Sequence, residues 1–449
     1  MKATMTQHVW RVMVTVSLSL LCLASAFAQD TPRLGKPEDA SDRQTLKQQE
    51  TAGRHELKIL LDNPAGGSIQ LLRVNPEVVN KSTGLLSVPL ADGRLPQFKL
   101  RNYIAPESLG DAGVTSENVA YTPAAYWFGY GVSDDKARSP TVSNDNVDAS
   151  SFIFLARRGN SLRGRMVVNG QLYLLEDVGK GQHGLMEVNE ALGLPCDVLE
   201  NEPENEPVEP KKLAEIKPTM SGTKSRHEIK VLLVTTQAAG QMRNPSAADI
   251  MTDEIMYFSE MGDQGAGLAL KLSVVKEFGS TAQDSLLHKG KDILDDFRNQ
   301  KTRATQEVAA LRDSVRADVV IVGAVHVESK EVTYQGARKN TAFYVFNVRA
   351  PQYFFHGFGH LMGIRHVWKE GDMDLDPPYQ HGFLSREYEG KRYASIGFDP
   401  KDCVAPGCEI VHRWSDPGLN LHFGRFGDPQ HADEIRYLNE RVVDIENFY

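Results

Sequence analysis

Between residues 54 and 196 the chain alternates hydrophobic and polar positions in short runs. Alternation with this period is typical of strands that bury one face. Asn169-Gly170 separates two of the runs, and Asn-Gly in that position favours a hairpin. The pattern predicts a β-rich domain over residues 54–196, without a titratable cluster that would indicate chemistry. The clearest runs lie at 57–60, 70–74, 126–130, 152–155, 164–168 and 171–175.

The pattern changes after residue 226, where hydrophobic runs alternate with longer amphipathic segments. Residues 246–261 and 292–315 have apolar positions at helical spacing, which predicts helices. Strands alternating with helices indicate an α/β or α+β domain over residues 227–449. The runs that predict its strands, rich in β-branched residues, are 228–234, 268–275, 317–322 and 341–348.

Two polar segments lie outside these domains. Residues 29–53 are polar throughout and predict a disordered leader. Residues 197–226 are rich in acidic residues and proline, and include the run ENEPENEPVEPKK. This composition predicts an extended linker that proteases can cut.

The first 28 residues have the pattern of a signal peptide. Lys2 and Arg11 precede an apolar run at 12–24, and Ala26-Phe27-Ala28 follows it. A membrane-spanning helix needs about 20 apolar residues, which is more than this run supplies. We therefore expect cleavage after Ala28 and export, either secreted or periplasmic, with no membrane insertion afterwards.

Composition and charge narrow the classes of partner. The 449 residues are 41% hydrophobic and 24% charged, which is typical of globular proteins and excludes collagen-like or wholly disordered chains. The formal net charge is −9, and loss of Lys2 and Arg11 with the signal peptide makes it −11. An acidic surface of this kind disfavours nucleic acid as a partner.

One segment carries recognisable chemistry. Residues 353–368 read YFFHGFGHLMGIRHVW, and His356, His360 and His366 follow the spacing H-x3-H-x5-H. Residues four apart project from one face of a helix, and Gly363 permits a turn that brings the third histidine round. Three neutral imidazoles leave a fourth position open on Zn²⁺, as in catalytic zinc sites. We predict a Zn²⁺ site with these ligands; the alternative is three histidines without metal.

This segment resembles the metzincin zinc-peptidase motif H-E-x-x-H-x-x-G-x-x-H. Residues 227–449 are more broadly similar to the reprolysin-like branch, especially bacterial secreted peptidyl-Asp metalloendopeptidases. The resemblance implies an α+β, metzincin-like domain with a mixed sheet, preceded by a β-rich propeptide-like domain over 54–196. It also implies a polypeptide as substrate or ligand, cleaved beside acidic residues. Supporting stretches are 230–234, 317–320, Cys403 to Cys408, Trp414-Ser415-Asp416-Pro417 and 432–440.

The chain departs from that family at three positions. Gly357 stands where the family has its catalytic glutamate. Loss of a positioned general base costs about 10²–10⁴ in rate. Ile396, within the likely Met-turn equivalent 394–398, replaces methionine, and Val367 stands where an aspartate often follows the last histidine.

The acidic loop 370–376 offers another carboxylate that could act as the base, although a solvated loop is the simpler interpretation. Its acids also loosely resemble a calcium loop, but Pro377 stands where the glycine of such a loop belongs.

The four cysteines have different expected roles. Cys22 is removed with the signal peptide. Cys403 and Cys408 are separated by Val-Ala-Pro-Gly, a turn sequence, so we expect a local disulfide in an oxidising compartment. Cys196 remains at the edge of the linker. The resemblance implies a prodomain cysteine that ligates the zinc and keeps the protein latent; a buried inert thiol or an intermolecular disulfide are the alternatives.

Three hypotheses for function follow. The first is an exported zinc-binding metallopeptidase homologue that is proteolytically impaired, because Gly357 replaces the general base, and that retains a polypeptide-binding cleft. The second is an active secreted zinc endopeptidase that uses another base or water. The third is a metal-free interaction protein.

Overall fold

A computed structural model describes most of the chain after residue 30. The predicted signal peptide, Cys403, the acidic loop 370–376 and linker residues 201–226 lie outside the described residues. Within the described part, no helix has the length and apolarity needed to cross a membrane. The described ranges are 31–38, 42–106, 115–117, 122–132, 147–192, 196–200, 227–243, 245–263, 270–282, 289–325, 328–329, 331–369, 377–399, 402 and 407–449.

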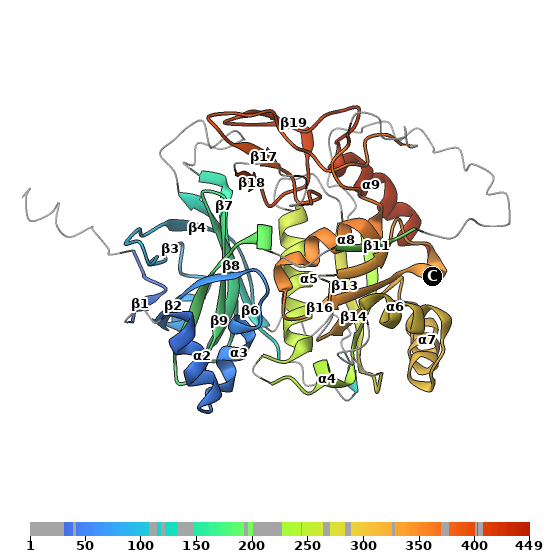
Figure 1. Ribbon diagram of the computed structural model, residues 1–449, viewed down its shortest axis with the longest axis horizontal. Helices are drawn as coiled ribbons and strands as arrows, with labels where there is room; N and C mark the ends of the chain where they lie inside the picture. The colour runs from blue at the N-terminus through green and yellow to red at the C-terminus, as the bar shows by residue number, and fades with distance from the viewer. Residues whose placement is uncertain are drawn as a thin grey trace, which may run out of the picture.

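The N-terminal half forms a nine-stranded antiparallel sheet, on the left in Figure 1. Asn169 and Gly170 both have positive φ and join β8 to β9, which confirms the predicted hairpin. In sheet order the strands are β1 (Gly35–Pro37), β2 (Gly66–Val74), β10 (His183–Val188), β9 (Gln171–Asp177), β8 (Ser161–Val168), β7 (Val147–Arg158), β6 (Ala125–Val132), β4 (Gln97–Ile104) and β3 (Leu85–Ser87).

The described residues of the expected disordered leader are ordered, so that prediction is wrong for them. They form β1 and helix α2 (Arg43–Thr51), which is followed by the short helix α3 (Lys58–Leu61). Asp42 caps α2 by accepting a hydrogen bond from Thr45 N at 2.8 Å. Leu46 is fully buried, and Arg43 donates to Leu61 O at 2.8 Å. One buried leucine and one bridging arginine anchor a segment whose overall composition is polar.

The C-terminal half is built on a seven-stranded mixed sheet, on the right in Figure 1. All neighbouring strands are parallel except β15 and β16, which are antiparallel. The molecule therefore combines helices with an antiparallel and a mixed sheet, as the α+β prediction requires. In sheet order the strands are β11 (Cys196–Leu199), β15 (Glu331–Tyr334), β16 (Phe343–Asn347), β14 (Val319–Ala324), β12 (His227–Thr235), β13 (Leu270–Gly279) and β5 (Thr115–Glu117).

The helices of this half differ in one respect from expectation. The predicted helix 292–315 is two helices, because Gln300 adopts a left-handed conformation and Thr302 caps a new helix. The helices are α4 (Gln237–Gly240), α5 (Ala247–Asp263), α6 (Gly290–Asn299), α7 (Arg303–Val315), α8 (Phe354–Met362) and α9 (Glu434–Ile445). Two further two-stranded sheets complete this half, at the top of Figure 1: β17 (Arg392–Ala394) with β18 (Cys408–Ile410), and β19 (Asp416–Leu421) with β20 (Gly424–Phe426).

The predicted boundaries between regions are not boundaries of the sheets. Strand β11 includes residues 197–199, which the composition assigned to the linker, yet they pair with β15. Strand β5, from within the predicted β-rich domain, pairs with β13 at the other edge of the mixed sheet. The N-terminal half therefore supplies both edge strands of the C-terminal sheet.

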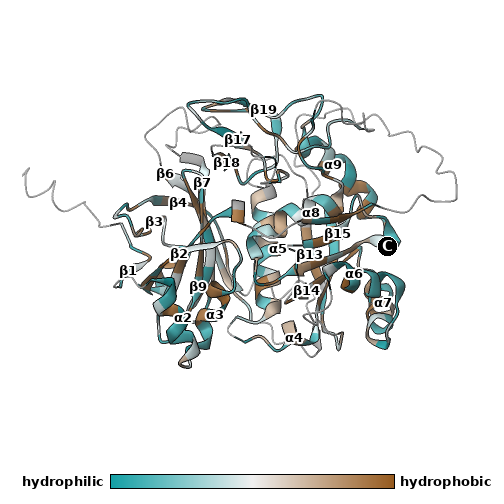
Figure 2. Ribbon diagram, in the orientation of Figure 1, coloured by the Kyte–Doolittle hydropathy of each residue, from teal (hydrophilic) through white to brown (hydrophobic). Residues whose placement is uncertain are grey.

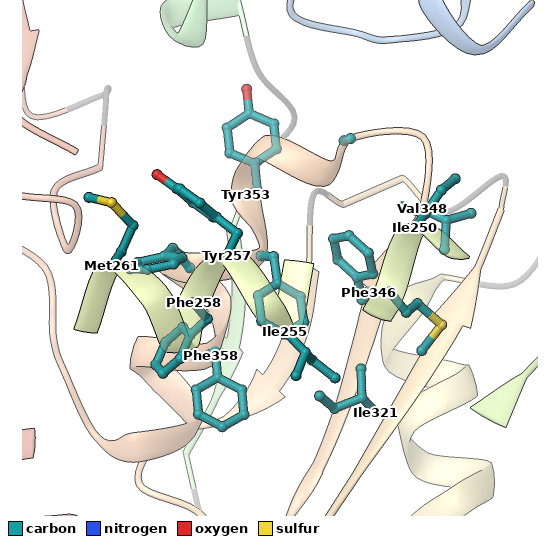
Figure 3. Close-up of a cluster of buried hydrophobic side chains, with 14 of the residues drawn as sticks. Ile250, Ile255, Tyr257, Phe258, Met261, Ile321, Phe346, Val348, Tyr353 and Phe358 are labelled. Atoms are coloured by element: carbon teal, nitrogen blue, oxygen red, sulfur yellow. The ribbon is translucent and has the colours of Figure 1, made fainter. Parts of the chain in front are cut away.

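Helix α5 lies between the two sheets, as Figure 1 shows. Its aromatic residues pack toward α8: Tyr257 and Phe258 lie 5.0 and 4.6 Å from Phe355 between ring centroids. Figure 3 shows the same cluster, with Phe258 beside Phe358 and Ile255 above Ile321. Figure 2 colours the ribbon by hydropathy. Buried hydrophobic residues of α5, of the antiparallel sheet and of the mixed sheet form one continuous core, so α5 joins the two halves.

Polar residues of α5 also meet the antiparallel sheet. Asp253 accepts hydrogen bonds from Arg158 Nη2 at 2.7 Å and from Arg163 Nη1 at 2.9 Å, and Arg165 pairs with Glu254. All five side chains are largely buried. Because burying charges is costly unless they are paired, this network requires the two halves to pack in one arrangement.

Candidate metal centre

Helix α8 carries the first two histidines and is buried along its whole length. It ends at Gly363, where φ is +114° and a Cβ atom would overlap the Tyr437 hydroxyl. Only glycine is suited to both conditions. Gly363 N and Ile364 N donate to Gly359 O at 2.9 and 2.8 Å, so the chain reverses here and returns toward the helix.

The reversal brings the three predicted ligands together. His360 Nε2 lies 2.9 Å from His356 Nε2 and 3.1 Å from His366 Nε2, and the remaining Nε2 pair is 3.4 Å apart. Four ligands placed tetrahedrally about 2.0–2.1 Å from a zinc ion are about 3.3 Å from one another. The three nitrogen atoms therefore have the spacing of three ligands around one ion.

The hydrogen bonds of the rings also fit a metal. His356 Nδ1 lies 2.8 Å from Ile396 O, and His360 Nδ1 lies 2.6 Å from Ile364 O. A carbonyl oxygen only accepts, so both Nδ1 atoms carry the proton and each neutral ring has a lone pair on Nε2. Two such lone pairs 2.9 Å apart repel each other unless a cation lies between them. Second-shell acceptors on Nδ1 are typical of metal-binding histidines.

Cys196 completes the group. Its Sγ and the three Nε2 atoms all lie within 4.8 Å of one another, and the group is the one that could hold a metal ion among the described residues. Cys196 begins strand β11, directly opposite Glu331 of β15. Two further contacts anchor this segment: Asp197 accepts from Ser329 Oγ, and Glu200 forms a two-point ion pair with Arg365 at 3.0 and 3.3 Å.

The turn 394–398 contacts the first of the histidines. Ile396 is buried and presents its carbonyl to His356. Glu434, at the start of α9, lies against Gly397 and accepts from Ser415 N at 2.6 Å. Burial raises the pKa of Glu434 to about 7, although hydrogen bonds from Ser415 and Ser395 act in the opposite direction.

Gly357 lies on the side of α8 that faces β15 and β16. A Cβ atom built there would lie 2.5 Å from Glu331 Cγ, 2.8 Å from Glu331 Cβ and 2.6 Å from Tyr344 Oη. Glu331 is fully buried, and its Oε1 lies 3.8 Å from His356 Nε2. Burial, and next the charges of Glu331 and Cys196, raise the pKa of Tyr344 well above its usual value.

Glu331 was missed by the sequence analysis. The run Glu331-Val-Thr-Tyr has the β-branched and aromatic residues of a strand, so the pattern could have revealed β15. No local pattern could have placed its first residue beside a histidine 25 positions later.

Other predicted residues lie outside this group. Cys408 is disulfide-bonded, but Cys403 is not among the described residues, so their pairing stays a prediction. The alternative base in loop 370–376 likewise falls outside the described residues. His381 Nδ1 lies 2.8 Å from His366 O, and His412 lies 3.4 Å from Glu190; neither belongs to the group of potential ligands.

Comparisons with known proteins point to peptidases. Two proteins named peptidyl-Asp metalloendopeptidase come from Stenotrophomonas maltophilia. The one from strain R551-3 is 26% identical over 408 residues, covering 87% of this chain and 88% of its own. The one from strain K279a is 23% identical, covering 96% and 97%. A third, from Xanthomonas campestris pv. campestris, is 24% identical and covers 97% and 98%. No family model matches the chain.

These distant relatives support a metallopeptidase-like protein with a metal cofactor. Similarity to solved structures is weaker. A chaperone–substrate complex has a TM-score of 0.38 at 15% identity, covering 50% of this chain and 40% of that one. Metalloproteinase-II from Bacteroides fragilis has a TM-score of 0.33 at 9% identity, covering 64% and 83%. Neither likeness is high enough to carry an argument.

Proposed function

We propose that this chain is an exported, zinc-binding metallopeptidase homologue made in a latent form. The observation that carries the proposal is the convergence of three Nε2 atoms at 2.9–3.4 Å with their Nδ1 protons directed away. Zinc would be held by His356, His360 and His366. When bound, it supplies a Lewis acid that polarises a carbonyl group and makes water more acidic.

Latency is assigned to Cys196. Its Sγ belongs to the same group of potential ligands, and a thiolate is a good fourth ligand for zinc. Strand β11 at the same time pairs with the outer edge of β15 and covers it. Cutting the predicted linker between residues 201 and 226 would let residues 196–200 leave, which would open the fourth metal position and the strand edge together.

The open edge would then bind a polypeptide. A strand edge presents unpaired N–H and C=O groups, and an extended peptide can add to it as another strand. The ligand would thus occupy the position of β11. The names of the relatives suggest cleavage of peptide bonds beside aspartate. We therefore propose that this chain binds polypeptides with acidic residues.

Gly357 cannot accept a proton, so the helix itself lacks the general base. We accordingly expect a chain that binds zinc and polypeptide, with hydrolysis impaired relative to proteins that carry a glutamate there. Hydrolysis that uses another base is the second candidate, and the buried carboxylate of Glu331 near His356 specifically favours it.

Metal analysis tests the zinc site. Purified full-length chain should contain one zinc per molecule, and His360→Ala should lose it because one of three nitrogen ligands is gone. His412→Ala is the matched control, since this histidine is similarly buried but lies outside the group. Absence of stoichiometric zinc from the unmodified chain would favour the metal-free alternative.

Thiol reactivity tests latency. Cys196 should react slowly with Ellman's reagent in the intact chain and faster after a chelator removes zinc. Cleavage within 201–226 should raise both its reactivity and the binding of fluorescein-labelled casein, followed by anisotropy. If the thiol reacts equally fast with and without chelator, Cys196 is not a zinc ligand.

A further inference from the structure

The side chain of Glu331 fills the space that a side chain at position 357 would need. The Cβ distances of 2.5 and 2.8 Å to Glu331 are shorter than heavy atoms in close-packed interiors tolerate. The gap between α8 and β15 therefore accommodates a carboxylate from the strand or one from the helix, and not both. In this chain the helix has glycine and the strand has glutamate.

Charge supports a role for Glu331 beside a metal. Its side chain is 0% exposed. Burying an ionised carboxylate is costly unless an opposite charge compensates. A divalent ion on the three Nε2 atoms supplies such a charge at close range, because Glu331 Oε1 lies 3.8 Å from His356 Nε2.

Glu331 is not itself one of the metal ligands. Among the described residues, the group of potential metal ligands holds Cys196 and the three histidines and does not include Glu331. The carboxylate thus lies beside the ligand set, next to His356. Cys196 stands directly opposite Glu331 in the strand pairing. Departure of residues 196–200 would therefore uncover Glu331 and the fourth position together.

We propose that Glu331 is the catalytic carboxylate of this protein, supplied by strand β15 in place of helix α8. The proposal rests on the proposed function, since it requires the zinc site and the release of Cys196. Hydrolysis adds water across the peptide bond: the carbonyl carbon gains hydroxyl, the C–N bond breaks, and the amine gains the remaining proton. Glu331 Oε1 would accept that proton from water and deliver it to the leaving nitrogen.

Whether the Glu331 side chain and a side chain at position 357 compete for the same space can be tested without measuring hydrolysis. Gly357→Ala should lower the Tm of the full chain, because the new methyl group overlaps Glu331. In a chain that carries Glu331→Gly, the same change should raise the Tm, because glycine removes both Cβ and Cγ of residue 331 and alanine favours a helix more than glycine does. All chains in the series carry Tyr344→Phe, which removes the hydroxyl that also lies near position 357. Equal effects of Gly357→Ala in both backgrounds would overturn the shared-space argument.

Hydrolysis and zinc binding are then measured together. The parent is the full chain with Cys196→Ala, cut within 201–226, and the probe is quenched fluorescein-labelled casein. Glu331→Gln keeps the volume and should lower the hydrolysis rate by about 10²-fold or more. Its zinc content should stay at one per molecule, because Glu331 is not among the potential ligands, although loss of the nearby negative charge should weaken the zinc affinity measured by competition with a chromophoric chelator. Glu277→Gln is the control, since Glu277 is a similarly buried glutamate of β13, which three strands separate from β15.

Each other outcome contradicts the proposal in a distinct way. An unchanged rate in Glu331→Gln means that this carboxylate is not used, and loss of stoichiometric zinc means that it is a ligand. A parent that contains zinc and binds casein but hydrolyses none refutes a catalytic Glu331, while the proposed zinc-binding function stands. Recovery of hydrolysis by Gly357→Glu combined with Glu331→Gly and Tyr344→Phe would add support, because it returns the carboxylate to the helix.

Discussion

At the residue scale, Glu434 links the turn beneath the histidines to α9. Its carboxyl group is wholly buried, and its neighbours are the backbone of Ser415 and Gly397. Burial raises the pKa of Glu434 to about 7, from its ordinary value of 4.5. The folded chain therefore holds this proton more tightly than the unfolded chain does.

This shift predicts how stability depends on pH. The contribution of Glu434 is fully present below pH 4.5 and is lost as the pH rises from 4.5 to about 7. Glu434→Gln stays neutral, so the difference in unfolding free energy between the original chain and this variant should shrink by up to about 3 kcal/mol across that window. Urea unfolding of both chains at pH 5 and pH 7.5 measures this difference in unfolding free energy. A difference that stays constant or grows with pH would show that the carboxyl group is ionised in the fold.

Residues that act through distant contacts are those that the sequence could not reveal. The spacing of His356, His360 and His366 is local, so their convergence could be predicted from helix geometry. Glu331 and Cys196 reach the same group only because β11, β15 and α8 pack together. Their roles depend on strand order, which hydrophobic periodicity does not encode.

At the element scale, periodicity located the elements with repeated hydrophobic positions. Strands β12 and β16 and helix α5 lie within a few residues of their predicted ranges. Helix α2 was missed because it buries Leu46 alone in an otherwise polar sequence. A single contact of this kind leaves no periodic signal, and composition alone then indicates disorder.

The one buried side chain of α2, Leu46, should contribute to the stability of the fold. Leu46→Ala removes methyl groups from a fully buried site and should lower the unfolding free energy by about 2–5 kcal/mol. Leu192→Ala is the control, because Leu192 is 63% exposed and its truncation should change stability by less than about 0.5 kcal/mol. Urea unfolding of the full chain distinguishes the two. Equal, small effects would mean that residues 43–51 do not pack on the sheet.

At the scale of the whole molecule, α5 joins two halves that the predicted linker connects. Its Asp253 is paired with Arg158 and Arg163, and Arg163 also pairs with Glu176 of β9 at 2.8 and 2.9 Å. Phe152 of β7 stacks on Tyr257 of α5. Contacts of both kinds are buried, and salt screens buried pairs much less than exposed ones.

Cutting the linker should therefore leave the two halves associated. Gel filtration of the full chain cut within 201–226 should show one complex, also at high salt. Arg163→Met leaves Glu176 without its buried partner, a change that costs about 3–5 kcal/mol, and should promote dissociation of the cut chain. Arg73→Met is the control, because the Arg73–Glu38 pair is largely exposed and is worth at most about 1 kcal/mol. Separation of the original cut chain at low salt would mean that the covalent linker, and not the α5 interface, keeps the halves together.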